Sequence, residues 1–213
     1  LYEVGELYDG YVVGEPESLA ESFDQRVYHH YRRARQAEGG VPILEALAQR
    51  LHDHAVDDAL EEFLEDGPGG KPWPVVAIMG GHAMGRHEPA YRDVARMARM
   101  LAERGYLLAS GGGPGAMEAT HLGALLAHQP EAALDEALSL LAPAPSYRDA
   151  GWLDAAFAVR ERFGEVGACS LAIPTWFYGH EPPNAFASHL AKYFSNSLRE
   201  DGLLAIATHG VIY

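Results

Sequence analysis

The chain of 213 residues has one cysteine, Cys169, and two lysines, Lys71 and Lys192. A single cysteine excludes an internal disulfide and is typical of a reducing compartment, so we expect a cytoplasmic protein. We interpret Cys169 as a small buried packing residue beside an apolar strand rather than as a nucleophile. The chain also lacks any run of 18 apolar residues, so we expect no membrane span and no membrane partner.

Positive charge is scarce as well. The chain has 16 Lys and Arg against 30 Asp and Glu, which gives a net charge of −14. The imbalance is concentrated in residues 1–73, with 16 acids and 6 bases, whereas residues 74–213 have 14 acids and 10 bases. Binding of nucleic acid needs clustered Lys and Arg to neutralise phosphates, so we expect no nucleic-acid partner. A small phosphorylated ligand remains compatible, because a few local donors suffice for it.

The N-terminal third is predicted to be helical. Residues 17–37 and 41–65 read as two helices, because each has apolar residues on one face. These faces comprise Leu19, Phe23, Val27 and Tyr31 in the first helix, and Ile43, Leu44, Leu47, Leu51 and Ala55 in the second. Residues 67–74 are rich in glycine and proline and read as a linker. We therefore predict a helical appendage over 1–66, the linker over 67–74, and a second domain over 75–213.

From Val75 onward, short apolar runs alternate with helical patterns. The expected strands are 75–79, 106–109, 170–173 and 210–213. The expected helices are 89–104, 116 to about 128, 131–141, 149–163, one from Asn184 to about 198 and a second to 207. Such alternation predicts an α/β protein with a Rossmann-like, doubly wound parallel sheet. Ligands of these sheets collect at the carboxyl ends of the strands.

The most informative segment runs from Leu107 to Glu118. An apolar strand pattern stops at four glycines in five positions, Gly111, Gly112, Gly113 and Gly115, and a helical pattern follows at once. Glycine lets the backbone approach a bulky anion and allows positive φ. The next helix aims unpaired N–H groups and its positive dipole end at the same point. A phosphate-bearing ligand, foremost a nucleotide, is the expected occupant; the alternative is a tight turn that binds nothing.

The same turn also fits the dinucleotide pattern G-x-G-x-x-A. That pattern belongs after the first strand of a sheet, with an acid ending the second strand about 20 residues on. Here an earlier strand precedes the turn, and the acids at that distance, Asp135 and Glu136, fall in a helical stretch. A nicotinamide-dependent oxidoreductase is therefore the weakest of the functions considered.

Three loops with unusual residues leave strand carboxyl ends: 80–87, 110–118 and 174–184. Their convergence at one edge of the sheet is the main argument for a site. The residues expected to bind substrate or its phosphate are Gly80, Gly81, Gly111, Gly112, Gly113, Gly115, Met117, Glu118 and Asn184. Plainer roles are open for three of them: Glu118 as a first-turn acid, Met117 in the core, and Asn184 as a helix cap.

Gly-Gly-Gly-Pro-Gly-Ala-Met-Glu at 111–118 resembles the glycine-rich motif of the LONELY GUY and "lysine decarboxylase-like" proteins, which are Rossmann-like. Gly80-Gly81 after the first strand is similar to that family's opening turn. Glu-Pro-Pro-Asn at 181–184 resembles a loop of its bacterial nucleotide 5′-monophosphate nucleosidase branch, and 192–213 resembles the approach to its second motif. The resemblance covers about 74–213 and not the appendage.

The resemblance implies hydrolysis of the N-glycosidic bond of a nucleoside 5′-monophosphate, giving free base and ribose 5-phosphate. It also implies a homodimer. The family's second motif, P-G-G-x-G-T-x-x-E, carries the catalytic glutamate and would begin just after Tyr213, so we expect the chain to continue there. Arg199 is the candidate catalytic arginine; its alternative is a surface arginine beside Glu200 and Asp201.

A second class of function is a non-catalytic nucleotide or molybdenum-cofactor carrier on the same fold. A pyridoxal enzyme is poorly supported, because Lys71 lies in a linker and Lys192 in an expected helix. Histidines on the candidate loops are possible acid–base groups: His82, His87 and His180. No pair of residues has metal-ligand spacing, and we expect neither a metal nor a cofactor.

Overall fold

The protein is an α/β molecule built on a five-stranded, all-parallel sheet. A computed structural model describes residues 1–164 and 167–213. The sheet order is β4-β3-β2-β1-β5. The strands are β1 Val75–Ile78, β2 Leu107–Ser110, β3 Ser170–Ala172, β4 His189–Leu190 and β5 Val211–Ile212. The predicted doubly wound, Rossmann-like fold class is confirmed.

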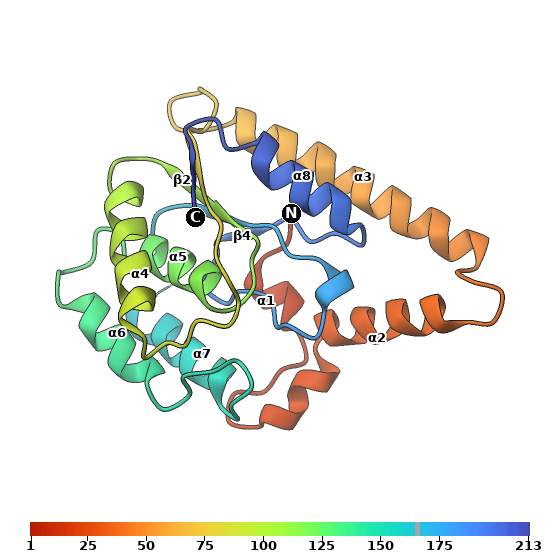
Figure 1. The fold of residues 1–213 in the computed structure, drawn as a ribbon, viewed down its shortest axis with the longest axis horizontal. Helices are drawn as coiled ribbons and strands as arrows, with labels where there is room; N and C mark the ends of the chain where they lie inside the picture. The colour runs from red at the N-terminus through yellow and green to blue at the C-terminus, as the bar shows by residue number, and fades with distance from the viewer. Residues whose placement is uncertain (165–166) are drawn as a thin grey trace.

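Helices surround the sheet (Figure 1). The α-helices are α1 Val4–Leu7, α2 Phe23–Gln36, α3 Ile43–Glu65, α4 Pro89–Ala102, α5 Ala116–Leu125, α6 Ala133–Leu141, α7 Trp152–Phe163 and α8 Asn196–Ala205; the 3₁₀ helices are η1 Pro16–Glu21 and η2 Trp176–Tyr178. Among residues 1–164 and 167–213, no helix is both long and apolar enough to cross a membrane.

The central strands β1, β2 and β3 bury both of their faces. In β1, Val75 and Ala77 pack in a cluster with residues of α3 and α8. Val76 and Ile78 point the other way and pack with α4 and α5. Alternate side chains of a strand lie on opposite faces, so a strand between two helical layers must be apolar throughout. This explains why the sequence shows short continuous apolar runs rather than alternation.

The chain reverses its direction of travel across the sheet at β1. It passes from β1 outward to β2, β3 and β4, and then returns to place β5 on the other side of β1. Ala77 of β1 pairs in register with Val211, while Val75 pairs with Leu107. Such a switch in strand order opens a crevice at the carboxyl ends of the strands.

The helix expected from Asn184 to about 198 is wrong. Residues 185–187 are buried, the chain then enters β4, and α8 begins only at Asn196. The Asn184 side chain accepts hydrogen bonds from the backbone N–H groups of Phe186 and Ala187, at 2.7 and 3.2 Å. The Ser188 hydroxyl donates to the Ser170 carbonyl at 2.8 Å, which docks the segment on β3. Tertiary pairing to β3 therefore overrides the local pattern, and 211–212 becomes the fifth strand rather than the fourth.

The N-terminal residues contact the sheet region closely. Tyr2 forms an antiparallel bridge with Leu190 of β4. Val4, Leu7 and Tyr8 belong to the same buried cluster as Leu190. The division of the chain into an appendage over 1–66 and a domain over 75–213 stays a prediction, and these contacts show that residues of the two parts pack together.

The expected helix over 41–65 is present as α3, but its N-terminal apolar face is not buried. Ile43, Leu44, Leu47 and Leu51 are 81%, 76%, 53% and 60% exposed. The buried residues of α3 are Asp53, Val56 and Leu60, from the middle of the helix onward. Figure 1 shows the reason, since the first half of α3 projects away from the sheet together with the end of α2.

Candidate functional site

The three candidate loops meet at the carboxyl ends of β1, β2 and β3. The N–H of Ala116 donates to the carbonyl of Gly81 at 3.2 Å, and the N–H of Asn184 donates to that of Gly112 at 2.9 Å. The carboxylate of Glu181 lies 3.4 Å from Nδ1 of His82. Residues from all three loops are thus in direct contact, as their positions after the strands predict.

Backbone geometry requires glycine at three of the candidate positions. Gly112 and Gly115 have φ of +71° and +72°, a region that disfavours a side chain. A Cβ on Gly80 would lie 2.4 Å from the Cβ of Ala116, so Gly80 permits β1 and α5 to approach closely. These glycines shape the turn, whether or not a ligand binds.

Gly111 and Gly113 have a different environment. Neither has a positive φ, so conformational strain does not explain them. A Cβ on Gly111 would lie 2.4 Å from Nη2 of Arg199 and 2.9 Å from Sδ of Met117. A Cβ on Gly113 would lie 2.8 Å from Cε of Met117 and 3.2 Å from Oε2 of Glu181. Gly111 faces Arg199 and Gly113 faces Glu181, so each glycine presents bare backbone to a charged side chain.

The turn also holds unpaired donors. Residues 111–118 are all buried. The N–H groups of Gly111, Gly113 and Gly115 make no hydrogen bond to any residue that the structure describes. Buried backbone N–H groups are almost always paired, so three unpaired groups in one turn indicate a place for an acceptor. They lie at the start of α5, where the helix dipole adds positive potential.

Arg199 lies at the same turn. Its Nε donates to the carbonyl of Ile173 at 3.1 Å, and its guanidinium lies 5.8 Å from the ring centroid of Tyr178. Within the described residues it has no carboxylate partner, although Glu200 and Asp201 follow it directly. Glu200 instead accepts a hydrogen bond from Asn196 at 2.9 Å. The charge of a half-buried guanidinium is therefore uncompensated beside Gly111.

Glu118 is in a buried ion pair that the sequence did not reveal. Its carboxylate accepts from Nε and Nη2 of Arg86 at 3.0 and 2.6 Å, and from the Tyr91 hydroxyl at 2.9 Å. Arg86 also donates to the carbonyls of Ala144 and Trp152, and stacks 4.5 Å from the Trp152 ring centroid. Arg86 lies within loop 80–87. The sequence signal that could have indicated its role is the presence of an arginine in this glycine-rich turn.

The charge on Arg86 is retained despite its burial. Burial acts to lower the pKa of Arg86, but Glu118 and Tyr91 together more than offset it, and the pKa is raised. Burial, together with the Glu118 charge, raises the pKa of Tyr91 well above its ordinary value. Glu118 thus faces Arg86 and Tyr91, and the substrate contact expected of it stays a prediction.

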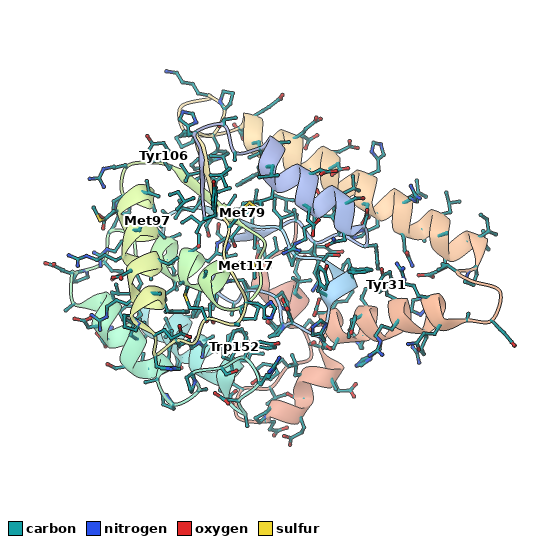
Figure 2. All side chains as sticks on the ribbon, in the orientation of Figure 1. Tyr31, Met79, Met97, Tyr106, Met117 and Trp152 are labelled. Carbon is teal, nitrogen blue, oxygen red and sulfur yellow. The ribbon has the colours of Figure 1, made fainter. Side chains whose placement is uncertain are left out.

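Met117 and Asn184 fill the inside of the turn. Met117 is 7% exposed and lies at the centre of the molecule in Figure 2. Asn184 is fully buried, and its side-chain amide donates to the Met117 carbonyl at 3.3 Å. Asn184 caps no helix; it joins the loop after β3 to the start of α5.

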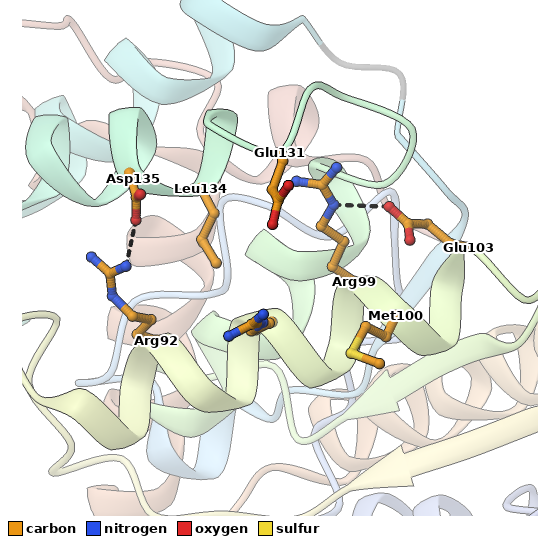
Figure 3. Close-up of a pocket in the computed structure, with 8 residues that line it drawn as sticks. Arg92, Arg99, Met100, Glu103, Glu131, Leu134 and Asp135 are labelled. Atoms are coloured by element: carbon orange, nitrogen blue, oxygen red, sulfur yellow. Dashed lines mark hydrogen bonds and ion pairs between the residues drawn. The ribbon is translucent and has the colours of Figure 1, made fainter.

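Two cavities are relevant to the choice of site. One of about 100 Å³ adjoins the start of α5 and is lined by residues that include His82, Gly115 and Glu118. A larger one of about 430 Å³ lies between α4 and α6 (Figure 3). Ion pairs Arg92–Asp135 and Arg99–Glu103 occupy its walls. Arg92 thus joins α4 to α6, and Arg99 also donates to the carbonyls of Gln129 and Pro130, so these arginines fasten α4 to its neighbours and we place the candidate site at the glycine turn.

Two of the remaining candidate groups lie together at Glu181, and the others lie elsewhere. His82 and His180 lie 3.4 and 4.0 Å from the Glu181 carboxylate, whereas His87 lies against Gly85. Lys192 is buried against Asp24 and not at the turn. Over residues 1–164 and 167–213, no group of three His, Cys, Asp or Glu is arranged to hold a metal ion. In comparisons with known proteins, no protein-family model and no curated protein matches the chain, so the residues of the site carry the case for its function.

Proposed function

We propose that this protein hydrolyses the N-glycosidic bond of a nucleoside 5′-monophosphate to free base and ribose 5-phosphate. The observation that carries the proposal is the uncompensated guanidinium of Arg199 beside a buried glycine turn with unpaired N–H groups. A phosphorylated sugar offers several acceptor oxygens to such an arrangement. An arginine binds phosphate through a planar fork of donors, and a helix N-terminus adds further donors.

The proposed reaction requires a negatively charged group near the sugar. Cleavage of a glycosidic bond passes through an oxocarbenium-like state, which a nearby carboxylate stabilises. The resemblance implies a glutamate for this role. Arg199 would hold the phosphate or ribose and orient that glutamate. Among the described residues, Glu181 has its carboxylate close to Gly113.

Binding is the first test. Calorimetry with AMP, GMP, CMP and UMP should show binding across 80–85, 111–118 and 181–184. Arg199→Ala should weaken it, whereas Arg92→Ala, which removes an exposed arginine on α4, should not. Tight NAD binding without binding of any mononucleotide would favour the oxidoreductase instead.

Turnover is the second test. Chromatography of the four digests should reveal a base peak together with ribose 5-phosphate. Arg199→Ala should lower base release by orders of magnitude, and by more than it weakens binding, if the arginine acts mainly on the transition state. Stoichiometric binding without base release from any nucleotide would favour the carrier, the alternative function.

A homodimer and a cytoplasmic location belong to the same proposal. Light scattering on the purified protein measures the first, and fractionation of cells measures the second. Neither result decides between hydrolase and carrier, so both are secondary to the turnover test.

A further inference from the structure

We propose that Tyr178 is the platform on which the base of the nucleotide stacks, and that α2 holds this platform in place. The inference rests on the proposed function and deepens it, because it assigns the base to one side of the site. It also gives the N-terminal helices a role in ligand binding.

Tyr178 combines exposure with a position next to Arg199. It is the last residue of η2, in the loop between β3 and β4, and it is 38% exposed. Its ring centroid lies 5.8 Å from the Arg199 guanidinium carbon, and that guanidinium adjoins Gly111. The hydroxyl of Tyr178 has no hydrogen-bond partner in the part of the chain that the structure describes. An exposed ring beside an anion-binding group is suited to a base whose phosphate or ribose is held by that group.

The two exposed aromatic residues of η2 face different partners. The ring of Phe177 lies 5.5 Å from the guanidinium of Arg35, on α2. Tyr178 is instead the residue that meets Arg199 of α8. Phe177 therefore contacts the N-terminal helices and Tyr178 contacts Arg199, and the two rings pack edge to face with their centroids 4.9 Å apart. This division provides a matched control on the same turn.

Helix α2 fixes the turn by several contacts. Asp24 accepts a hydrogen bond from Nε1 of the buried Trp176 at 3.0 Å. Gln25 donates to the carbonyl of Gly179 at 3.1 Å, on the other side of Tyr178. A Cβ on Gly179 would lie 2.3 Å from the ring of Tyr28, so the turn packs directly on α2. Figure 1 shows η2, in light blue, beside the start of α2.

These contacts preorganise Tyr178. A stacking platform held before binding loses little conformational entropy when the ligand arrives, which favours affinity. Residues before and after Tyr178 are both bonded to α2, while Tyr178 itself is 38% exposed and has Arg199 and Phe177 as its neighbours. The N-terminal helices thus act as positioning elements for the base side of the site.

The test compares a ligand with a base to one without. Calorimetry measures AMP and ribose 5-phosphate binding to the wild-type protein and to Tyr178→Ala, Tyr178→Phe and Phe177→Leu. Loss of one base stack weakens binding roughly tenfold to hundredfold. We expect that loss for AMP in Tyr178→Ala only, with ribose 5-phosphate unchanged, and near wild-type AMP affinity in Tyr178→Phe and Phe177→Leu.

The positioning role has its own variant. Gln25→Ala removes one tether of the turn, and it should weaken AMP binding while leaving ribose 5-phosphate affinity and the unfolding midpoint nearly unchanged. Equal AMP affinity in wild type and Tyr178→Ala would overturn the base platform and leave the proposed function intact. Absence of binding of both ligands to the wild-type protein would overturn the proposed function, and this inference with it.

Discussion

Adjacent glycines in the turn have different roles, because their backbone angles and the atoms around them differ. Gly112 has positive φ and close neighbours from β3 and the loop after it, whereas Gly111 has ordinary φ and faces the end of the Arg199 side chain. A methyl group at Gly112 strains the backbone, while one at Gly111 displaces a flexible guanidinium. Stability and ligand binding should therefore separate between the two positions.

Gly111→Ala should weaken mononucleotide binding at least tenfold and change the free energy of unfolding by less than about 1 kcal/mol. Gly112→Ala should lower that free energy by about 1–3 kcal/mol, because a non-glycine residue is forced to positive φ. Urea denaturation and calorimetry on both variants measure the two effects. Similar losses of stability in both would show that Gly111 is also a structural position.

His121 makes the stability sensitive to acid. It is fully buried below the turn, with Nε2 2.8 Å from the Ser110 hydroxyl and Nδ1 unpaired among the described residues. Burial lowers the pKa of His121 from 6.5 to about 3. The unfolded chain then binds a proton below pH 6.5 that the folded protein excludes until about pH 3. The resulting stability is complete above pH 6.5 and is lost progressively as the pH falls.

Between pH 7 and pH 5, this one group should lower the free energy of unfolding by about 2 kcal/mol. Urea denaturation at the two pH values measures the change. His121→Gln should reduce the difference between them, even if the variant is less stable at both. An undiminished pH dependence in His121→Gln would assign the effect to other groups.

At the scale of elements, the start of α5 is fastened by charge. The pair Arg86–Glu118 joins the loop after β1 to the first turn of α5, and Arg86 adds bonds to the carbonyls of Ala144 and Trp152. Both charged groups are 1% exposed. A buried pair contributes little net stability relative to apolar residues, but the loss of one partner strands the other charge. The pair thus fixes the geometry of the glycine turn.

Glu118→Gln should destabilise the protein by about 3–5 kcal/mol, since Arg86 stays buried and charged. Glu103→Gln is the matched control, because Glu103 pairs with Arg99 at 2.9 Å on the surface of α4. It should cost less than about 1 kcal/mol. Thermal or urea unfolding compares them, and equal small effects would show that water reaches Arg86.

At the scale of the whole molecule, a buried ion pair links the N-terminal and C-terminal parts of the chain. Asp24 of α2 and Lys192, just after β4, are 168 residues apart and almost completely buried. Burial lowers the pKa of Lys192, while Asp24 counteracts that effect. Asp24 accepts hydrogen bonds from both Lys192 and Trp176, and Lys192 lies against the Trp176 ring. This polar cluster therefore joins α2, η2 and the edge of the sheet.

Asp24→Ala should lower the free energy of unfolding by about 3–5 kcal/mol, because Lys192 loses its partner inside the protein. The double variant Asp24→Leu with Lys192→Met should recover a large part of the loss. Urea denaturation followed by both fluorescence and circular dichroism measures it. No recovery in the double variant would indicate that the Trp176 and Gln25 contacts, rather than the ion pair, stabilise this junction.

The sequence predicted the features that depend on neighbouring residues. Apolar runs of about five residues followed by glycine or proline gave β1, β2 and β3, and glycine content marked the turn at 111–115. Periodicity gave most of the helices within a few residues at each end, but the single helix expected over 17–37 is divided at Ser22 into the 3₁₀ helix η1 and α2. Periodicity failed after Asn184, where a buried apolar segment pairs with β3, and it suggested a buried face on α3 that is in fact exposed.

By itself, then, the sequence determined the parallel α/β fold class and the position of the glycine turn, because strand burial, helix periodicity and turn chemistry are local. Tertiary structure alone decided which charges meet there. Arg86 and Glu118 are 32 residues apart, and Arg199 reaches Gly111 from beyond β4. Such contacts depend on the order of strands in the sheet, since β1, β2 and β3 are parallel neighbours and the loops after them therefore lie side by side.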